Sequence, residues 1–244
     1  MLHETFRFHL LFPCAAAHSH IFAGLAFIVT HSASFFHLKT SKDVPQTRDV
    51  FFRGVLKGQE LIENGRVKNA ANDMNGIVAA YNSYLDRYRK VAGDDGPVAT
   101  LTARGTAWTG MAAGNNNGIL DVNAGQTFTG GGEGATFFQH LRASGFITGN
   151  PADVGVNALP VNAWGGRVGV VATTLVQGRA AARQLVCMGN VPGKAAAALD
   201  VQLDDGRPNN GSFRATQGAN NVVPGVAATA YSEDQTYTVC RDIN

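Results

Sequence analysis

Apolar residues follow a helical period over the segment from about Phe51 to Lys90. They recur at steps of three and four residues, at Val67, Ala70, Ala71, Met74, Ile77, Val78, Tyr81, Tyr84, Leu85 and Tyr88. This spacing predicts one amphipathic helix, and at 1.5 Å per residue such a helix is roughly 60 Å long. Since no single small domain is that wide, we expect part of the helix to project from the domain or to meet partners.

The predicted helix ends in the sequence VAGDDGP, residues 91–97. Gly93 is suited to a left-handed cap, and Pro97 prevents the helix from continuing. These limits assign residues 51–92 to a long helix and residues 93–244 to a head.

The head is predicted to combine short strands, turns and short helices. Glycine, with 29 residues in the chain, is concentrated after the long helix together with Asn and Thr, which suits turns and short strands. Helical patterns are found at residues 133–145, 179–189 and 194–203, and strand patterns at residues 167–173, 211–215 and 237–240. The chain is therefore predicted to be an α+β protein.

Residues 1–50 form a separate region of different composition. Six of the seven histidines lie in residues 1–38, and the apolar run from Ile21 to Thr30 is shorter than the roughly 20 residues that cross a bilayer. Together with residues 10–17, this run is compatible with a broken membrane span or with a signal-peptide core. A charged stretch containing Pro45 follows and is interpreted as a linker. We expect this leader and linker to be disordered or to reflect a misassigned start.

Composition limits the class of protein. A chain of 244 residues with 45% hydrophobic and 16% charged residues can bury a core of ordinary size, so one globular domain plus an extension is expected. The 20 basic and 18 acidic residues are interleaved, without the Lys/Arg block of a surface that follows phosphates. We therefore expect no nucleic-acid partner.

The three cysteines, at positions 14, 187 and 240, form no CxxC or CxxCH motif, which argues against a metal knuckle or c-type haem. Cys187 and Cys240 both lie in the β-rich half, where they either pair or remain two buried thiols. A disulfide between them would close a loop of about 54 residues and stabilise the fold by roughly 4 kcal/mol in the entropic description. Pairing would also favour an oxidising compartment.

The densest group of carboxylates consists of Asp200, Asp204 and Asp205. Oxygen ligands this close together in a turn can bind Ca²⁺, although the spacing differs from the EF-hand pattern. The alternative is that these side chains cap the turn. Asp94 and Asp95 pose the same choice after the long helix, and we expect them to form a turn. Apart from this calcium ion, no cofactor is expected.

A catalytic centre is not indicated by the sequence. Acid–base or nucleophilic catalysis needs a nucleophile, a base and a group that orients the base. His140 is the only histidine outside the leader, and it lies in a predicted helix beside Gln139 and Arg142 with no Ser or Cys motif near it. We expect His140 to have a packing role and the protein not to be an enzyme.

The segment from residue 54, GVLKGQELIENGRVKNAANDMNGIVAAYNSYLDRYRKVAGDDG, closely resembles the post-transmembrane half of the long helix of type IV pilins and type II secretion pseudopilins. EGATFFQHLRASGFITG resembles the short helix after the pilin loop, and PVNAWGGRVGV the glycine-rich entry to the pilin sheet. VCMGNVPGKAAAALDVQLDDGRPNNGSFRA and YTVCRDI resemble the start and end of the C-terminal disulfide loop. The resemblance covers residues 53–244.

The front of the chain departs from this family. Such proteins begin with a short basic leader, a Gly-Phe-Thr/Ser-Leu-x-Glu motif and about 20 apolar residues that run into the helix. This sequence has the histidine-rich leader and the linker in their place, so it offers a prepilin peptidase no recognisable motif. An altered reading frame, a misplaced start or divergence would each produce this departure.

The resemblance implies a pilin-like ladle, with a long N-terminal helix packed on a small antiparallel sheet and with Cys187 and Cys240 closing the C-terminal disulfide loop. It implies a structural subunit of a bacterial type IV pilus or type II secretion pseudopilus, assembling through the long helix. The expected partners are other pilin or pseudopilin subunits and the inner-membrane assembly machinery. The expected location is the cell envelope, in the inner membrane before assembly and then in a periplasmic or extracellular filament.

The alternative function is that of an extracellular binding module. The Gly/Asn-rich loop at residues 110–132 and the acidic turn at residues 200–206 would then form an adhesive surface that binds a ligand or calcium.

Overall fold

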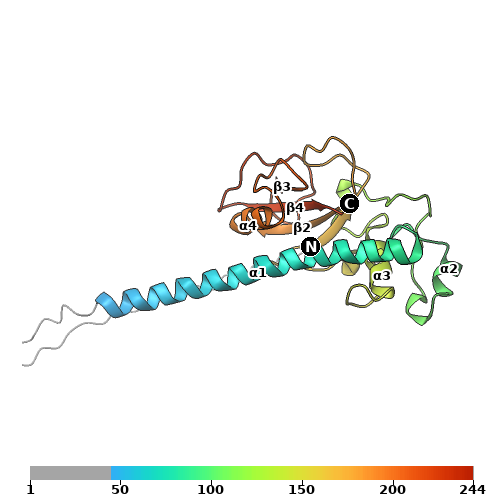
Figure 1. Ribbon diagram of the computed structural model, residues 1–244, viewed down its shortest axis with the longest axis horizontal. Coiled ribbons are helices and arrows are strands. Elements are labelled where there is room, and N and C mark those ends of the chain that lie inside the picture. The colour runs from blue at the N-terminus through green and yellow to red at the C-terminus, as the bar shows by residue number, and fades with distance from the viewer. Residues whose placement is uncertain (1–44, 244) are drawn as a thin grey trace, which may run out of the picture. The chain divides into compact units, whose positions relative to one another are not determined.

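The computed structural model describes residues 45–243 and has an α+β fold (Figure 1). Its helices, strands and 3-10 turns (η) follow in the order α1 (Pro45–Tyr88), α2 (Val98–Thr102), η1 (Thr106–Trp108), η2 (Ala124–Gln126), α3 (Gly134–Ala143), η3 (Gly155–Ala158), β1 (Val168–Val171), β2 (Leu185–Pro192), α4 (Gly193–Leu203), β3 (Phe213–Gln217) and β4 (Thr236–Asp242). Most of the leader predicted at residues 1–50 lies outside the described residues. Within the described part, no helix is both long and apolar enough to cross a membrane.

Helix α1 differs from the prediction at both ends. It begins at Pro45, so the last residues of the predicted linker are helical; proline suits the first helical position because its missing N–H has no partner there anyway. It ends at Tyr88, and the left-handed residue after it is Arg89, with φ of 55°. Arg89 N–H donates to the Leu85 carbonyl over 2.8 Å, which is the single-bond left-handed cap. The prediction that Gly93 caps the helix was therefore wrong.

Helix α3 ends as the sequence predicted. Gly145 has φ of 78°, and its N–H donates to the Arg142 carbonyl over 2.9 Å while Phe146 N–H donates to the Leu141 carbonyl over 3.0 Å. These two bonds define a Schellman motif, and the apolar pair Phe146 and Leu141 that accompanies it belongs to the core.

Four antiparallel strands form one sheet in the order β1-β2-β4-β3. Strands β1, β3 and β4 and helix α4 occur where the sequence predicted them. The last strand of the chain, β4, lies between β2 and β3. Cys187 of β2 is directly opposite Cys240 of β4, and the two are joined by a disulfide.

The predicted helix at residues 179–189 was wrong, because this segment leads into strand β2. The alanines at positions 180–182 favour helix, but in the structure all three are exposed and lie in a loop. The following run from Leu185 to Met188 is buried throughout. A strand covered on both faces shows such a continuous apolar run without alternation, so tertiary packing overrides the helical propensity.

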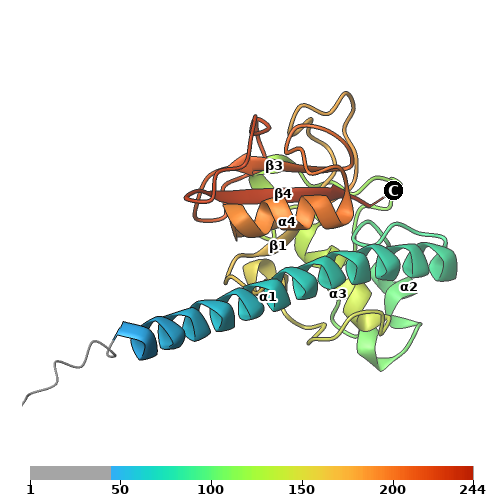
Figure 2. The same cartoon turned by 60° about the vertical axis from the view of Figure 1, so that its left-hand side comes forward.

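The two faces of the sheet contribute to different clusters. Val186, Met188 and Val239 belong to the main core, which also contains the buried side chains of α1 and α3. Leu185 and the disulfide point to the other face, where they pack with Phe128. Alternate residues of a strand point to opposite faces, so one face of the sheet meets α1 and the other is covered by the loops. Figure 2 shows α1 passing along the sheet and α3.

Candidate functional site

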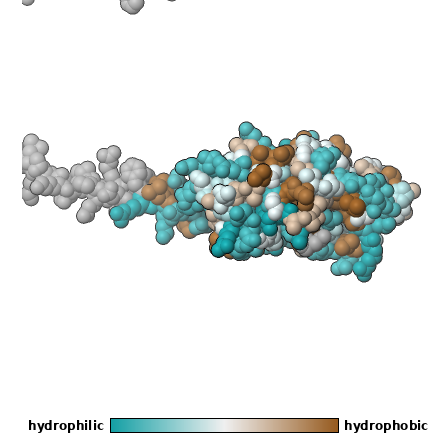
Figure 3. All heavy atoms as spheres, turned by 90° about the horizontal axis from the view of Figure 1, so that it is seen from above, coloured by the Kyte–Doolittle hydropathy of each residue, from teal (hydrophilic) through white to brown (hydrophobic). Residues whose placement is uncertain are grey.

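The N-terminal part of α1 is exposed in the unit formed by residues 46–244. Val67 is the first buried side chain of the helix after residue 53. The preceding turns carry exposed apolar side chains, with exposed fractions of 44 to 64%, at Val55, Leu56, Leu61 and Ile62. Brown, apolar atoms are visible at the narrow end of the coloured surface (Figure 3). This part of α1 therefore presents apolar surface that its own head does not cover.

Glycines mark one face of the same helix. Gly54, Gly58, Gly65 and Gly76 fall within about 40° of one another at 3.6 residues per turn. A Cβ atom built at any of the four meets nothing within 4 Å. Each glycine costs roughly 1 kcal/mol of helix stability relative to alanine. Packing within the described residues therefore gives no reason for glycine on this face, which lies roughly opposite the buried residues of α1.

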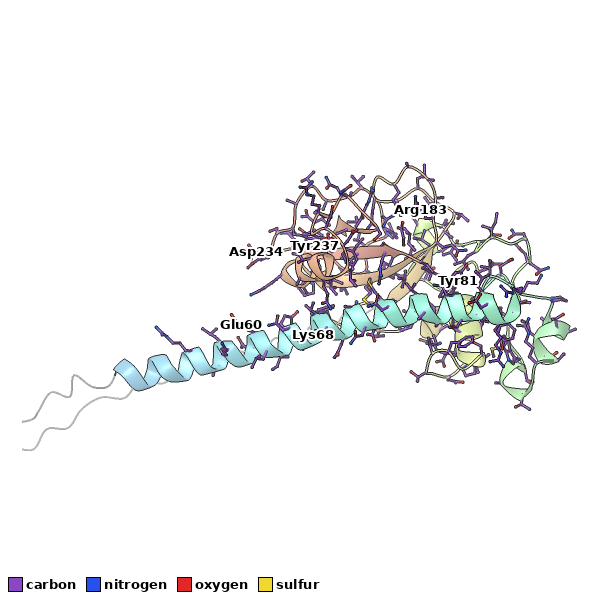
Figure 4. All side chains as sticks on the ribbon, in the orientation of Figure 1. Glu60, Lys68, Tyr81, Arg183, Asp234 and Tyr237 are labelled. Atoms are coloured by element: carbon purple, nitrogen blue, oxygen red, sulfur yellow. A yellow bond between two sulfur atoms is a disulfide. The ribbon has the colours of Figure 1, made fainter. Side chains whose placement is uncertain are left out.

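The head holds the other face of α1 through apolar packing and several polar contacts, two of which involve Glu63 and Asn75. Trp164 Nε1 donates to Glu63 Oε1 over 2.7 Å, and the Arg241 guanidinium donates to the Asn75 side-chain oxygen. In Figure 4, Glu60 is labelled toward the projecting end of α1, Lys68 lies where the head begins to cover the helix, and Tyr81 lies where α1 packs against the head. The helix thus changes from an exposed to a buried environment along its length.

The structure brings together the three carboxylates of the acidic turn. Oxygen atoms of Asp200, Asp204 and Asp205 lie within 4.8 Å of one another. Protein donors already contact each residue: Gly206 N–H and the Tyr231 hydroxyl bond to Asp200 over 2.9 and 2.6 Å. The other two carboxylates accept from neighbours in the turn and from the start of β3, namely Arg207, Asn210, Ser212 and Phe213.

Burial and hydrogen bonding shift the pKa values of the carboxyl groups in the acidic turn in different directions. Burial raises the pKa of Asp200, and the bonds from Tyr231 and Gly206 oppose that rise. The pKa of Asp205 is lowered by the bonds from Arg207 N–H and the Asn210 amide. The contacts favour the turn-capping alternative, since carboxylates accept from backbone N–H groups. Calcium binding here remains a prediction from the sequence.

Asp94 and Asp95 are more deeply buried than the sequence indicated, with exposed fractions of 2% and 0%. Asp94 accepts from Asn117 N–H over 2.9 Å and from Gly118 N–H over 2.7 Å. It therefore fixes part of the Gly/Asn-rich loop at residues 110–132. Asp94 was expected only to form a local turn. It also binds backbone N–H groups that lie more than 20 residues further along the chain.

Glu133, which directly follows this loop, holds it in place, and the sequence pattern did not indicate this role. Its carboxylate accepts from Asn115 N–H over 3.0 Å and from Asp121 N–H over 2.8 Å. Burial raises its pKa, and the two bonds oppose the rise. In the sequence, Glu133 is a single acidic residue in a glycine-rich segment. That pattern does not indicate which N–H groups its carboxylate binds.

His140 is buried, and both of its ring nitrogens are engaged by the backbone. Gly93 N–H donates to Nδ1 over 3.1 Å, so Nε2 carries the proton and donates to the Ala112 carbonyl over 2.9 Å. Burial lowers the pKa of His140. This arrangement agrees with the packing role expected from the sequence and leaves neither nitrogen available as a general base.

Searches against protein-family models, curated proteins and solved structures found no match to this chain.

Proposed function

We propose that this protein is a structural subunit of a bacterial filament of the type IV pilus or type II secretion pseudopilus kind, with the ladle-like arrangement of a pilin. The support is the combination of a 44-residue helix, a four-stranded antiparallel sheet and a disulfide near the C-terminal end. The residues that resemble pilins form these elements.

The observation that carries the proposal is the exposed part of α1. Burying an apolar side chain of this size contributes roughly 1.5 to 3 kcal/mol, so Val55, Leu56, Leu61 and Ile62 favour association. The glycine face allows the backbone of another helix to approach closely. A helix that meets the head on one side and has small residues on the other suits packing between subunits.

In this proposal α1 packs against the helices of other subunits, and the head carries the outward surface. The partners are further copies of this chain or related subunits, together with an inner-membrane assembly machinery. The protein would lie in the cell envelope and then in a periplasmic or extracellular filament.

The first experiment compares the chain as written with a version whose residues 1–52 are replaced by a standard prepilin leader and apolar helix. Cells making each chain are fractionated and imaged by negative-stain electron microscopy. Filaments from the replacement support the proposal. Absence of filaments from both chains would favour the alternative of a binding module.

A second experiment tests the exposed part of α1 in the version that forms filaments. Leu61→Glu with Ile62→Glu should abolish filaments, because two charges would have to be buried between subunits. Val226→Glu is the matched control, since Val226 is 85% exposed on a loop of the head. Normal filaments from the helix variant would contradict the proposed role of α1.

A further inference from the structure

A surface hollow of about 330 Å³ lies beside the ends of β3 and β4. Its charged lining residues are Arg179, Arg183, Arg214 and Asp242. Three cations therefore face one anion, in a chain whose total net charge is only +2. Positive charge is therefore in local excess here, although residues 93–244 hold 9 basic and 11 acidic residues in all.

Arg179 is held rigidly at the base of this hollow. Its side chain is 3% exposed, and Nε lies 3.0 Å from Asp242 Oδ1. Its two terminal nitrogens donate to Gln177 Oε1 over 2.8 Å, to the Ser212 carbonyl over 2.9 Å and to the Cys240 carbonyl over 3.2 Å. The guanidinium thus has a fixed position, set by strand β4 and by the loops that precede β2 and β3.

The single carboxylate is shared between two arginines. Asp242 Oδ2 accepts from Arg183 Nη1 over 3.1 Å, while its Oδ1 is bound to Arg179. Arg214 bonds to the carbonyl oxygens of Gly211 and Gln177, over 3.1 Å each. Carbonyl groups carry no net charge, so these contacts leave an excess of two positive charges around the hollow.

The electrostatics of Arg179 are consistent with this excess. Burial lowers its pKa, Asp242 opposes that change, and the nearby Arg214 and Arg183 lower the pKa further. Repulsion among the three guanidinium groups would be relieved by an anion between them.

We propose that this hollow, which we call the arginine pocket, binds a small oxyanion, either a phosphate or a carboxylate. Guanidinium groups donate paired N–H groups that match both oxyanions. Arg183 has a 59% exposed side chain and can turn toward a ligand, whereas Arg179 provides a fixed charge. The label in Figure 4 places Arg183 on the loop before β2. The pocket is separate from the exposed part of α1, so the proposal does not depend on filament formation.

The test measures the thermal unfolding midpoint, Tm, of the full-length protein in sodium phosphate, sodium acetate and sodium chloride at equal ionic strength and pH. With a Kd of about 1 mM, about 20 mM of the bound anion should raise Tm by about 4 °C relative to chloride. A rise in phosphate alone identifies phosphate as the ligand class, and a rise in acetate identifies carboxylate.

Variants assign the effect to the pocket. Arg183→Gln should reduce the Tm rise by at least half, and Arg214→Gln should do the same. Arg53→Gln is the matched control, because Arg53 is an exposed arginine on α1. Isothermal titration calorimetry with the same anions gives a second readout if Arg214→Gln lowers the starting Tm. Equal Tm in all three salts, or an equal rise in Arg183→Gln and the unsubstituted protein, would overturn the proposal.

Discussion

The Tyr84 hydroxyl donates a hydrogen bond to Asp95 Oδ2 over 2.6 Å, and Arg104 Nη1 donates to the same oxygen over 2.7 Å. Tyr84 and Asp95 are both fully buried. Burial and the Asp95 carboxylate together raise the pKa of Tyr84, so the phenol stays protonated and remains a donor. The contact fastens the last turns of α1 to the segment that follows it.

Tyr84→Phe should lower the free energy of unfolding by about 1 to 3 kcal/mol, because it removes a donor from a buried carboxylate. Urea unfolding followed by circular dichroism measures the change. Tyr88→Phe is the control, since Tyr88 is only half-buried and packs through its ring against Tyr84 and Trp108. An equal loss of unfolding free energy in both variants would show that the hydrogen bond to Asp95 does not contribute to stability.

Stability should fall as the pH decreases below the ordinary pKa of histidine, about 6.5. The pKa of His140 is lowered in the folded state, so the unfolded state binds more protons in this range. The contribution of neutral His140 is therefore present above pH 6.5 and is lost as the pH falls toward the lowered pKa. Between pH 7 and 5.5 the loss should be up to about 1 kcal/mol.

Urea unfolding at these two pH values measures the His140 effect. His140→Gln should flatten it, since the amide can accept from Gly93 N–H without titrating. Burial raises the pKa of Glu133 and Asp200, which gives the opposite slope at more acidic pH, so the comparison stays above pH 5.5. An unchanged pH dependence in His140→Gln would contradict this assignment.

Gly65→Ala should separate the stability of the subunit from its assembly. The free energy of unfolding should rise by up to about 1 kcal/mol, because alanine favours helix and its Cβ meets nothing at this position. Filament yield should fall, since the added methyl group prevents close helix packing. Asn64→Ala, on an adjacent exposed position, should raise stability without reducing filaments. Normal filament yield in Gly65→Ala would show that the glycine face does not pack against another helix in the filament.

Calcium should change the Tm by less than about 1 °C when about 2 mM calcium chloride is compared with a chelator. The reason is that protein donors already contact each carboxylate of the acidic turn. A clear rise in Tm with calcium would instead favour the calcium-binding alternative.

The same acidic turn should be sensitive to loss of charge at Asp204. Asp204→Asn should cost about 1 kcal/mol, because Asp204 Oδ2 accepts from Phe213 N–H over 2.7 Å and a charged acceptor makes the stronger bond. Asp234→Asn, on an exposed position labelled in Figure 4, is the control and should leave urea unfolding unchanged. Equal stability of the two variants would exclude the turn-capping role of Asp204.

The sequence predicted the elements whose signal is local. The buried stripe of α1 follows from its period, and Gly145 marks the end of α3 because the Schellman motif needs a left-handed residue. Strand β2 could not be predicted, since the alanine-rich segment before it favours helix. It becomes a strand through its pairing with β1 and β4. Arg89, and not Gly93, takes the left-handed conformation that caps α1, and its residue type does not signal this.

The sites were less predictable than the elements. The three aspartates of the acidic turn are near in sequence, so their proximity could be expected. The arginine pocket joins Arg179 of the loop before β2 to Arg214 of β3 and Asp242 of β4. Asp95 meets Tyr84 and Arg104 through a turn. Such groupings depend on strand order and loop path, which spacing along the chain does not contain.

The position of β4 has a consequence for the biosynthesis of this protein. Because β4 lies between β2 and β3, neither strand can complete its pairing on that side until residues 236–242 have left the ribosome. Once β3 (Phe213–Gln217) has been made, the nascent head carries two unpaired strand edges until β4 follows, and such edges are prone to association with other chains. A premature stop shortly before residue 236 would remove the centre of the sheet, along with one half of the disulfide.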